Sequence, residues 1–289
     1  MNYFKPWEEL TIQDNFIFQH VMRNPEICKG FLEKLLNFTI KRVNYLQPEM
    51  TVAPRVESKS IRFDLYVEDE RGIAYDVEMQ TTNSASTLAK RTRYYQSAMD
   101  TDTLKRGDDY AELKDSFIIF VCTFDPFDKG LYAYTFRNRC VESDGLELND
   151  GATKIFLNSK GMTGNLNDDI KNFLMYIGGQ SPVGNFVNLV ATEVDKVKRQ
   201  DILRVEYMKI NADIMDARRE ARIEGHAEGR IEGLVEGIAT GLVKGRAEII
   251  LDVAKTLLRK NFPKEEIMEI AKCTQEQFLQ AKRELDAES

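Results

Sequence analysis

I-R-F-D-L-Y-V-E-D-E-R-G-I-A-Y-D-V-E-M-Q, residues 61–80, is the stretch of this sequence that decides its fold. Apolar and polar residues alternate on both sides of a short charged turn, which is the pattern of two β-strands joined as a hairpin. The turn predicts a three-residue loop from Glu70 to Gly72, with the glycine in the left-handed conformation. The loop therefore sets which residues of the two strands face each other.

This register places Tyr66 opposite Asp76 and Asp64 opposite Glu78, with their Cβ atoms about 4.5–5.5 Å apart. The alternation also divides the side chains between two faces of the hairpin. The face expected in the core holds Ile61, Phe63, Leu65, Val67, Ile73, Tyr75, Val77 and Met79. The other face, expected to be acidic, holds Arg62, Asp64, Tyr66, Asp76, Glu78 and Gln80.

Opposed carboxylates on a strand pair repel each other unless a positive charge lies between them. A divalent cation would supply that charge, and Mg²⁺ prefers hard oxygen ligands such as carboxylates, waters and phosphate oxygens. The alternative is a solvated strand face whose charges pair with Arg62 and with other basic side chains. The spacing alone leaves both interpretations open.

The rest of the chain predicts a mixed α/β region followed by helices. Helices are expected at 14–22, 25–37 and 84–105, and strands from about residue 41, at 116–124, at 131–136 and at 153–157. After about residue 165 the strand signals stop. Helices are then expected at 167–177, 185–219, 246–260 and 264–285, the last range containing a turn near Lys272 to Thr274.

Composition narrows the class of protein. The chain has 289 residues, with 40 basic and 47 acidic side chains, so its net charge of −7 argues against a surface that coats nucleic acid generally. Four scattered cysteines and two histidines indicate neither a disulfide framework nor a zinc site. No apolar run approaches the length of a membrane span, and the opening M-N-Y-F-K-P-W lacks the apolar stretch of a signal peptide. A cytoplasmic protein without a membrane segment is expected.

Several segments together resemble one family. D-x(13)-E-M-Q, which begins at Asp64, is similar to a variant active-site motif of the PD-(D/E)XK nuclease superfamily, in the branch of transposases and recombination-promoting nucleases. Further similar segments are D-N-F-I-F-Q from Asp14, A-K-R-T-R-Y-Y-Q from Ala89, G-D-D-Y-A-E-L-K from Gly107 and the Glu-Gly tail. The resemblance implies a restriction-endonuclease-like α/β core, with a mixed sheet flanked by helices and followed by an α-helical C-terminal region.

The resemblance also implies site residues. Asp64 and Glu78 would be metal ligands for Mg²⁺ or Mn²⁺, and Gln80 would complete the catalytic set where the superfamily usually has lysine. Phe63 stands where the family pattern has proline. Glutamine can orient water or a phosphate oxygen, but it cannot supply positive charge. Asp76 is either an accessory ligand or a merely exposed aspartate.

The helix expected after the hairpin carries basic and aromatic residues close together. Such a helix could hold a DNA backbone and stack a base, as the resemblance also implies for the helix that lines the cleft. The alternative is an amphipathic helix whose tyrosines pack on the sheet. The candidate DNA contacts are Lys90, Arg91, Arg93, Tyr94 and Tyr95.

Glycine recurs at every fourth position from Gly225 to Gly245. Each glycine costs a helix about 1 kcal/mol relative to alanine, so a lone exposed helix is poorly supported. The segment is read either as a helix for self-association or intramolecular packing, or as a mobile linker. The predicted regions are a nuclease-like domain at 1–160, a helical extension at 161–222, a repeat helix at 223–247 and a helical hairpin at 248–289.

The hypothesis from the sequence is a Mg²⁺-dependent DNA endonuclease associated with transposition or recombination, which could form homo-oligomers through the Gly225–Gly245 helix. Its rival is a non-catalytic assembly or DNA-tethering protein that acts through the C-terminal helical repeat. A DNA-reading helix-turn-helix at the C-terminal end is also conceivable, although a plain helical hairpin is favoured.

Overall fold

The computed structural model describes residues 4–46, 51–52, 61–82, 85–104 and 106–287. The chain divides into two compact units, Met1–Ile210 and Asn211–Ser289. Among the described residues, no helix combines the length and the apolar character that crossing a membrane requires.

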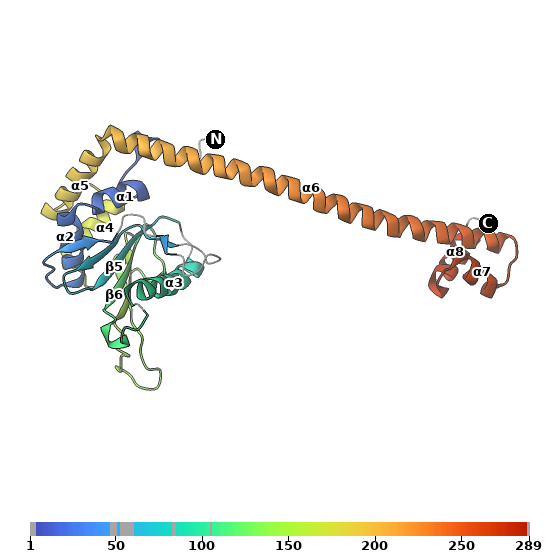
Figure 1. Ribbon diagram of the computed structural model, residues 1–289, viewed down its shortest axis with the longest axis horizontal. Coiled ribbons are helices and arrows are strands. Elements are labelled where there is room, and N and C mark those ends of the chain that lie inside the picture. The colour runs from blue at the N-terminus through green and yellow to red at the C-terminus, as the bar shows by residue number, and fades with distance from the viewer. Residues whose placement is uncertain (1–3, 47–50, 53–60, 83–84, 105, 288–289) are drawn as a thin grey trace. The chain divides into compact units, whose positions relative to one another are not determined.

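The first unit is built on a mixed six-stranded sheet (Figure 1). Its spatial order is β1 (Val43–Tyr45), β4 (Tyr66–Asp69), β5 (Ala74–Gln80), β6 (Ser116–Cys122), β8 (Ala152–Asn158) and β7 (Ala133–Phe136). The central strands β5, β6 and β8 run parallel, and antiparallel strands complete both edges. A separate two-stranded pair joins β2 (Thr51–Val52) and β3 (Ile61–Arg62). The predicted restriction-endonuclease-like class, a mixed sheet with flanking helices, is confirmed.

The hairpin forms in the predicted register. Tyr66 lies opposite Asp76, and Gly72 takes a φ of 81° in the three-residue loop. The register continues beyond the last paired residue of β4, because the Val77 amide donates to the Leu65 carbonyl oxygen at 2.9 Å. The loop chemistry read from the sequence therefore sets the strand pairing.

One face of the sheet packs against four helices, α1 (Asn15–Met22), α2 (Pro25–Leu36), α4 (Asp168–Ile177) and α5 (Asn185–Lys198). The hairpin contributes Leu65, Val67, Tyr75, Val77 and Met79 to this core. Because α4 and α5 share one core with α1 and α2, the boundary predicted at residue 160 does not separate compact units. The division lies near Ile210 instead.

The opposite face of the sheet carries the predicted acidic residues but lies under α3 (Ala85–Thr103), so the alternative of a solvated strand face is wrong. Phe63 was expected in the core with Leu65, but it belongs to the cluster under α3 and stacks on Tyr66 with ring centroids 4.9 Å apart. The reason is that Phe63 precedes β4, where strict strand alternation no longer applies. The side chains of Ile61 and Arg62 lie outside the described part of the chain.

The predicted helix 185–219 is also wrong, since the chain turns after α5. The backbone passes through Arg199 and Gln200, and the Trp7 indole, from the short 3-10 helix η1 (Trp7–Glu9), donates to the Lys198 carbonyl oxygen at 3.2 Å. The next helix, α6, then runs without a break over Asp201–Arg259. It therefore contains the whole glycine repeat, which was expected to be a separate segment. A second 3-10 helix, η2, spans Tyr110–Glu112.

The second unit consists of the later part of α6 with α7 (Lys264–Ala271) and α8 (Gln275–Ala287). The three helices bury a small core, and the turn expected near Lys272 is present with φ 52° at that residue. Thr274 and Gln277 form a reciprocal cap. The Thr274 amide donates to Gln277 Oε1 at 2.9 Å, and the Gln277 amide donates to Thr274 Oγ1 at 3.2 Å. The core residues are Ala254, Ile267, Ala271, Cys273, Phe278 and Ala281.

Candidate functional site

The candidate site is a cluster of buried carboxylates on β5 and on the segment that precedes β4. Asp76, Glu78 and Gln80 alternate on the face of β5 that lies under α3, and each is at least nine-tenths buried. Asp64 reaches the same place from the other arm of the hairpin. The hairpin register thus brings together the two residues predicted as metal ligands and the glutamine predicted beside them.

Backbone and side chain lock Asp64 and Glu78 to each other. The Asp64 amide donates to Glu78 Oε1 at 2.8 Å, and the Met79 amide donates to Asp64 Oδ2 at 3.1 Å. Each carboxylate therefore accepts a hydrogen bond from the strand that carries the other. This exchange fixes the separation of the two carboxylates through the main chain.

Two amides from α1 hold the remaining oxygen of Asp64. Asn15 Nδ2 and Gln19 Nε2 donate to Asp64 Oδ1 at 2.9 and 2.8 Å. Neither residue was among those predicted for the site. Their signal was a spacing of four within D-N-F-I-F-Q, which places both side chains on one face of a helix, but nothing in the sequence names their acceptor.

Arg91 of α3 is the cation of the cluster. Its guanidinium donates to Glu78 Oε2 at 3.0 Å, to Gln80 Oε1 at 2.7 Å and to the Tyr95 hydroxyl at 3.0 Å. It also lies 5.2 Å from the Tyr95 ring centroid and 5.3 Å from that of Phe120. Arg91, predicted as a DNA contact, therefore points into the carboxylates.

The other predicted DNA contacts divide between the surface and the core. Lys90, Arg93 and Tyr94 are exposed on α3. The Tyr95 ring packs edge-on against Phe63 with centroids 5.3 Å apart, so the packing alternative applies to this tyrosine. The helix therefore presents one cation inward and two outward among these five positions.

Asp76 is the least satisfied group in the cluster. Its exposed fraction is 0%, and no residue in the described part of the chain donates a hydrogen bond to either carboxylate oxygen. Leaving a buried carboxylate without a partner costs several kcal/mol, so such a group either takes up a proton or receives a cation. Asp76 is thus neither the exposed aspartate of the alternative interpretation nor an ordinary structural acid.

Burial raises the pKa of all three acids. For Glu78 the desolvation of the carboxylate acts together with the nearby charge of Asp64, and its pKa rises to about 8. For Asp76 burial and then the charges of Glu78 and Asp64 raise the pKa well above its usual range. For Asp64 burial raises the pKa, although the amides of Asn15 and Gln19 oppose that effect. If all three acids were ionised, a single guanidinium would leave the cluster short of positive charge, and the raised pKa values reflect this shortage.

The donor set fits a hard divalent cation. Among the residues that the structure describes, no three Asp, Glu, His or Cys side chains are arranged as a ready-made metal site. Asp64 and Glu78 supply carboxylate oxygens of the kind that Mg²⁺ prefers, and the orphaned oxygens of Asp76 lie beside them. Arg91 now satisfies Glu78, so a cation bound there would take over part of its role.

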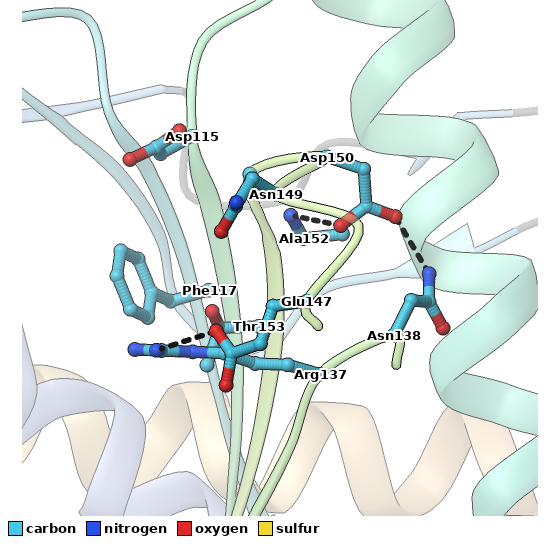
Figure 2. A pocket seen from close by; sticks show the side chains of 10 residues that line it. Asp115, Phe117, Arg137, Asn138, Glu147, Asn149, Asp150, Ala152 and Thr153 are labelled. Atoms are coloured by element: carbon cyan, nitrogen blue, oxygen red, sulfur yellow. Dashed lines mark hydrogen bonds and ion pairs between the residues drawn. The ribbon is translucent and has the colours of Figure 1, made fainter. Parts of the chain in front are cut away.

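A polar pocket at the opposite edge of the sheet is separate from this cluster. Its cavity of about 260 Å³ lies where β6 and β8 begin, whereas Gln80 pairs with Cys122 where β6 ends (Figure 2). Arg137 and Glu147 form an ion pair of 3.4 Å across it. Among the described residues that line this pocket, none has a buried polar side-chain atom without a partner. The carboxylate cluster is therefore the better candidate for a catalytic site.

Removing one α1 amide should loosen Asp64. We expect Gln19→Leu to lower the free energy of unfolding by about 1–2 kcal/mol, because one hydrogen bond to a buried carboxylate is lost. Denaturant titration measures this cost. In an Asp64→Ala background the same substitution should cost much less, and an equal cost in both backgrounds would show that Gln19 acts elsewhere.

Asp76→Asn should change how stability depends on pH. A carboxyl group whose pKa is higher in the folded state stabilises the fold below its ordinary pKa, and this stability is lost as pH rises toward the raised value. In chelator, the variant should therefore be more stable than the wild type at pH 8 and gain little at pH 4. Denaturant titration at both pH values checks this. The surface change Asp144→Asn should show no such difference, and an Asp76→Asn effect that is constant with pH would contradict the assignment.

Comparison with known proteins agrees with this geometry. The family model described as PD-(D/E)XK nuclease family transposase matches residues 16–175, which contain the six-stranded sheet, the carboxylate cluster and Arg91. No curated protein and no solved structure matches the chain. The resemblance read from D-x(13)-E-M-Q is confirmed, and the match covers more than half of the sequence. The chain belongs to the PD-(D/E)XK nuclease family transposases.

Proposed function

We propose that this protein is a Mg²⁺-dependent DNA endonuclease that hydrolyses phosphodiester bonds during transposition or recombination. The observation that carries the proposal is the buried cluster of Asp64, Asp76 and Glu78 with Arg91 as its cation. A purely structural strand has no need of three buried acids that lack sufficient positive charge. Family membership supports a nuclease associated with transposition.

Asp64 and Glu78 are the residues that would hold the metal ion. When bound, a divalent cation lowers the pKa of water and stabilises negative charge on a phosphate. The protein's own contribution is to hold the two carboxylates at a fixed separation through the Asp64 and Met79 amides. Asn15 and Gln19 keep the Asp64 carboxylate from rotating, because both donate to the same oxygen.

Gln80 and Arg91 together do what a lysine would do at position 80. The Gln80 amide nitrogen donates to the Thr82 carbonyl oxygen at 2.7 Å, and its oxygen accepts from Arg91. Glutamine therefore orients, and the guanidinium beside it supplies the positive charge for a phosphate in its transition state. Arg91 can reach solvent, since its side chain is 34% exposed.

The DNA strand would approach along α3. Lys90 and Arg93 are exposed on this helix, and Tyr94 is 36% exposed beside them. Basic side chains bind the phosphate backbone, and an exposed ring can stack on a base. Because the whole chain has a net charge of −7, this local surface would have to overcome a repulsive background, which makes binding sensitive to salt.

The assembly or tethering alternative has one observation in its favour, the exposed apolar side chains along α6. It does not account for Asp76. A metal titration separates the two functions, because a protein that only assembles has no reason to bind Mg²⁺ through Asp64.

We expect Asp64→Asn and Glu78→Gln each to abolish Mg²⁺-dependent nicking of plasmid DNA, since each removes a carboxylate without removing bulk. Calorimetry should show at least tenfold weaker Mg²⁺ binding. Circular dichroism in chelator should show that both variants stay folded. Their melting temperature should fall modestly, because the new amide nitrogen cannot accept the hydrogen bond that the lost oxygen accepted, which outweighs the relief of repulsion. Asp115→Asn, at the other edge of the sheet, is the matched control and should stay active. Full activity in either site variant would refute the assignment.

A charge relocation tests the pairing of Gln80 with Arg91. Arg91→Gln should lower the nicking rate by about 10²-fold, the usual cost of one charged donor to a developing anion. The double variant that also carries Gln80→Lys should nick DNA at least tenfold faster than Arg91→Gln alone, because the positive charge returns within reach of the same site. Gln80→Lys alone should retain or raise activity. No recovery in a double variant that melts like the wild type would show that Arg91 has another role.

A further inference from the structure

The four carboxylate oxygens of Asp64 and Glu78 have different kinds of donor. Asp64 Oδ1 accepts from two side-chain amides, whereas Asp64 Oδ2 and Glu78 Oε1 each accept from a main-chain amide of the hairpin. Glu78 Oε2 accepts from Arg91 Nη2 at 3.0 Å. Among the residues that the structure describes, this is the only ion pair that either carboxylate makes. One of the four oxygens is therefore held by a charge, and the other three are held by neutral dipoles.

The charged donor competes with a metal ion, and the neutral donors do not. The amides keep the two carboxylates in place without repelling a cation. The Arg91 guanidinium repels one, because like charges a few ångströms apart raise each other's energy most where water is excluded. Glu78 is buried, so water screens this repulsion poorly. A divalent cation and Arg91 Nη2 therefore compete for the Glu78 carboxylate.

The contacts of Arg91 allow it to release Glu78 while the rest of its side chain stays supported. Its Nη1 donates to Gln80 Oε1 at 2.7 Å, and its Nη2 donates to both Glu78 and the Tyr95 hydroxyl. The guanidinium also lies against the rings of Tyr95 and Phe120. Neither the bond to Gln80 nor the ring contacts involve Glu78. Because the side chain is 34% exposed, Nη2 can turn from Glu78 toward solvent.

A DNA phosphate can replace Glu78 as the partner of Arg91. The same helix exposes Lys90, Arg93 and Tyr94, the surface along which a strand would approach. A phosphate oxygen accepts a charged hydrogen bond from a guanidinium as a carboxylate oxygen does. The exchange therefore keeps the number of charged hydrogen bonds of Arg91 constant. It also frees Glu78 Oε2 at the moment when a phosphate is present.

We infer that Arg91 gates the metal site in response to DNA. Without DNA it pairs with Glu78 and lowers the affinity of the two carboxylates for a divalent cation. With DNA it turns to a phosphate and leaves Glu78 to the cation. Each ligand then raises the affinity for the other by the same factor, since coupling between two binding events is reciprocal. The inference rests on the proposed nuclease function and adds to it that the DNA strand loads the site.

Calorimetry without DNA tests the competition in the full-length protein. Arg91→Gln should bind Mg²⁺ at least about fivefold more tightly than the wild type, because the competing charge is gone. Arg93→Gln is the matched control. It removes the same charge from an exposed position of the same helix and should leave the Mg²⁺ affinity unchanged. Arg91→Met, which keeps an apolar stem against Tyr95, is the second variant if circular dichroism shows that Arg91→Gln is unfolded.

The sign of the effect separates a gate from a structural role. Arg91→Gln is expected to nick DNA more slowly, yet the gate requires that it bind the metal ion more tightly. A variant that merely damaged the site would lose both properties. Equal or weaker Mg²⁺ binding by Arg91→Gln would therefore overturn the gate.

A second titration tests the coupling to DNA. Ca²⁺ is the probe, and gel electrophoresis checks that a short DNA duplex stays intact. The duplex should raise the Ca²⁺ affinity of the wild type at least about fivefold and that of Arg91→Gln clearly less. An equal gain in both proteins would overturn the inference.

Asp64→Asn distinguishes failure of the gate from failure of the proposed function. If Asp64→Asn abolishes Mg²⁺ binding but Arg91→Gln does not tighten it, the gate is wrong and the metal site stands. If neither the wild type nor Arg91→Gln binds Mg²⁺, or if Asp64→Asn binds it as the wild type does, the metal site is refuted and the gate with it.

Discussion

The burial of carboxylates beside too little positive charge is the constraint on which the first unit depends. Among the residues that the structure describes, Asp64, Asp76 and Glu78 lie under α3 with one guanidinium, and none donates a hydrogen bond to Asp76. Burial of this kind opposes folding and is tolerated only where the surrounding structure is stable enough to carry it. The large apolar core on the other face of the sheet provides that stability.

The site draws together elements that cover opposite faces of the sheet. α1 packs with the helices of one face and α3 covers the other, yet both reach the hairpin, through Asn15 and Gln19 in one case and Arg91 in the other. The carboxylates are therefore fixed by neighbours that are distant in sequence. A shift of either helix would change the donors around Glu78 and Asp64, which couples the geometry of the site to the packing of the whole unit.

The second unit differs from the first in having only a small core and a long exposed helix. Its small core holds α7 and α8 against the end of α6, while the preceding turns of α6 stay exposed. The exposed apolar side chains of α6 form a row that the small core of this unit does not cover.

The sequence by itself determined the local features of this protein. Turn chemistry at Gly72 set the hairpin register, so the approach of Asp64 to Glu78 followed from the spacing alone. The break in alternation at Phe63, the inward turn of Arg91 and the role of Asn15 and Gln19 were decided by tertiary structure. Alternation assigns a side chain to a face, but only packing against α3 decides whether that face is buried. The burial of Asp76, and with it the charge imbalance of the site, therefore could not be read from the strand pattern.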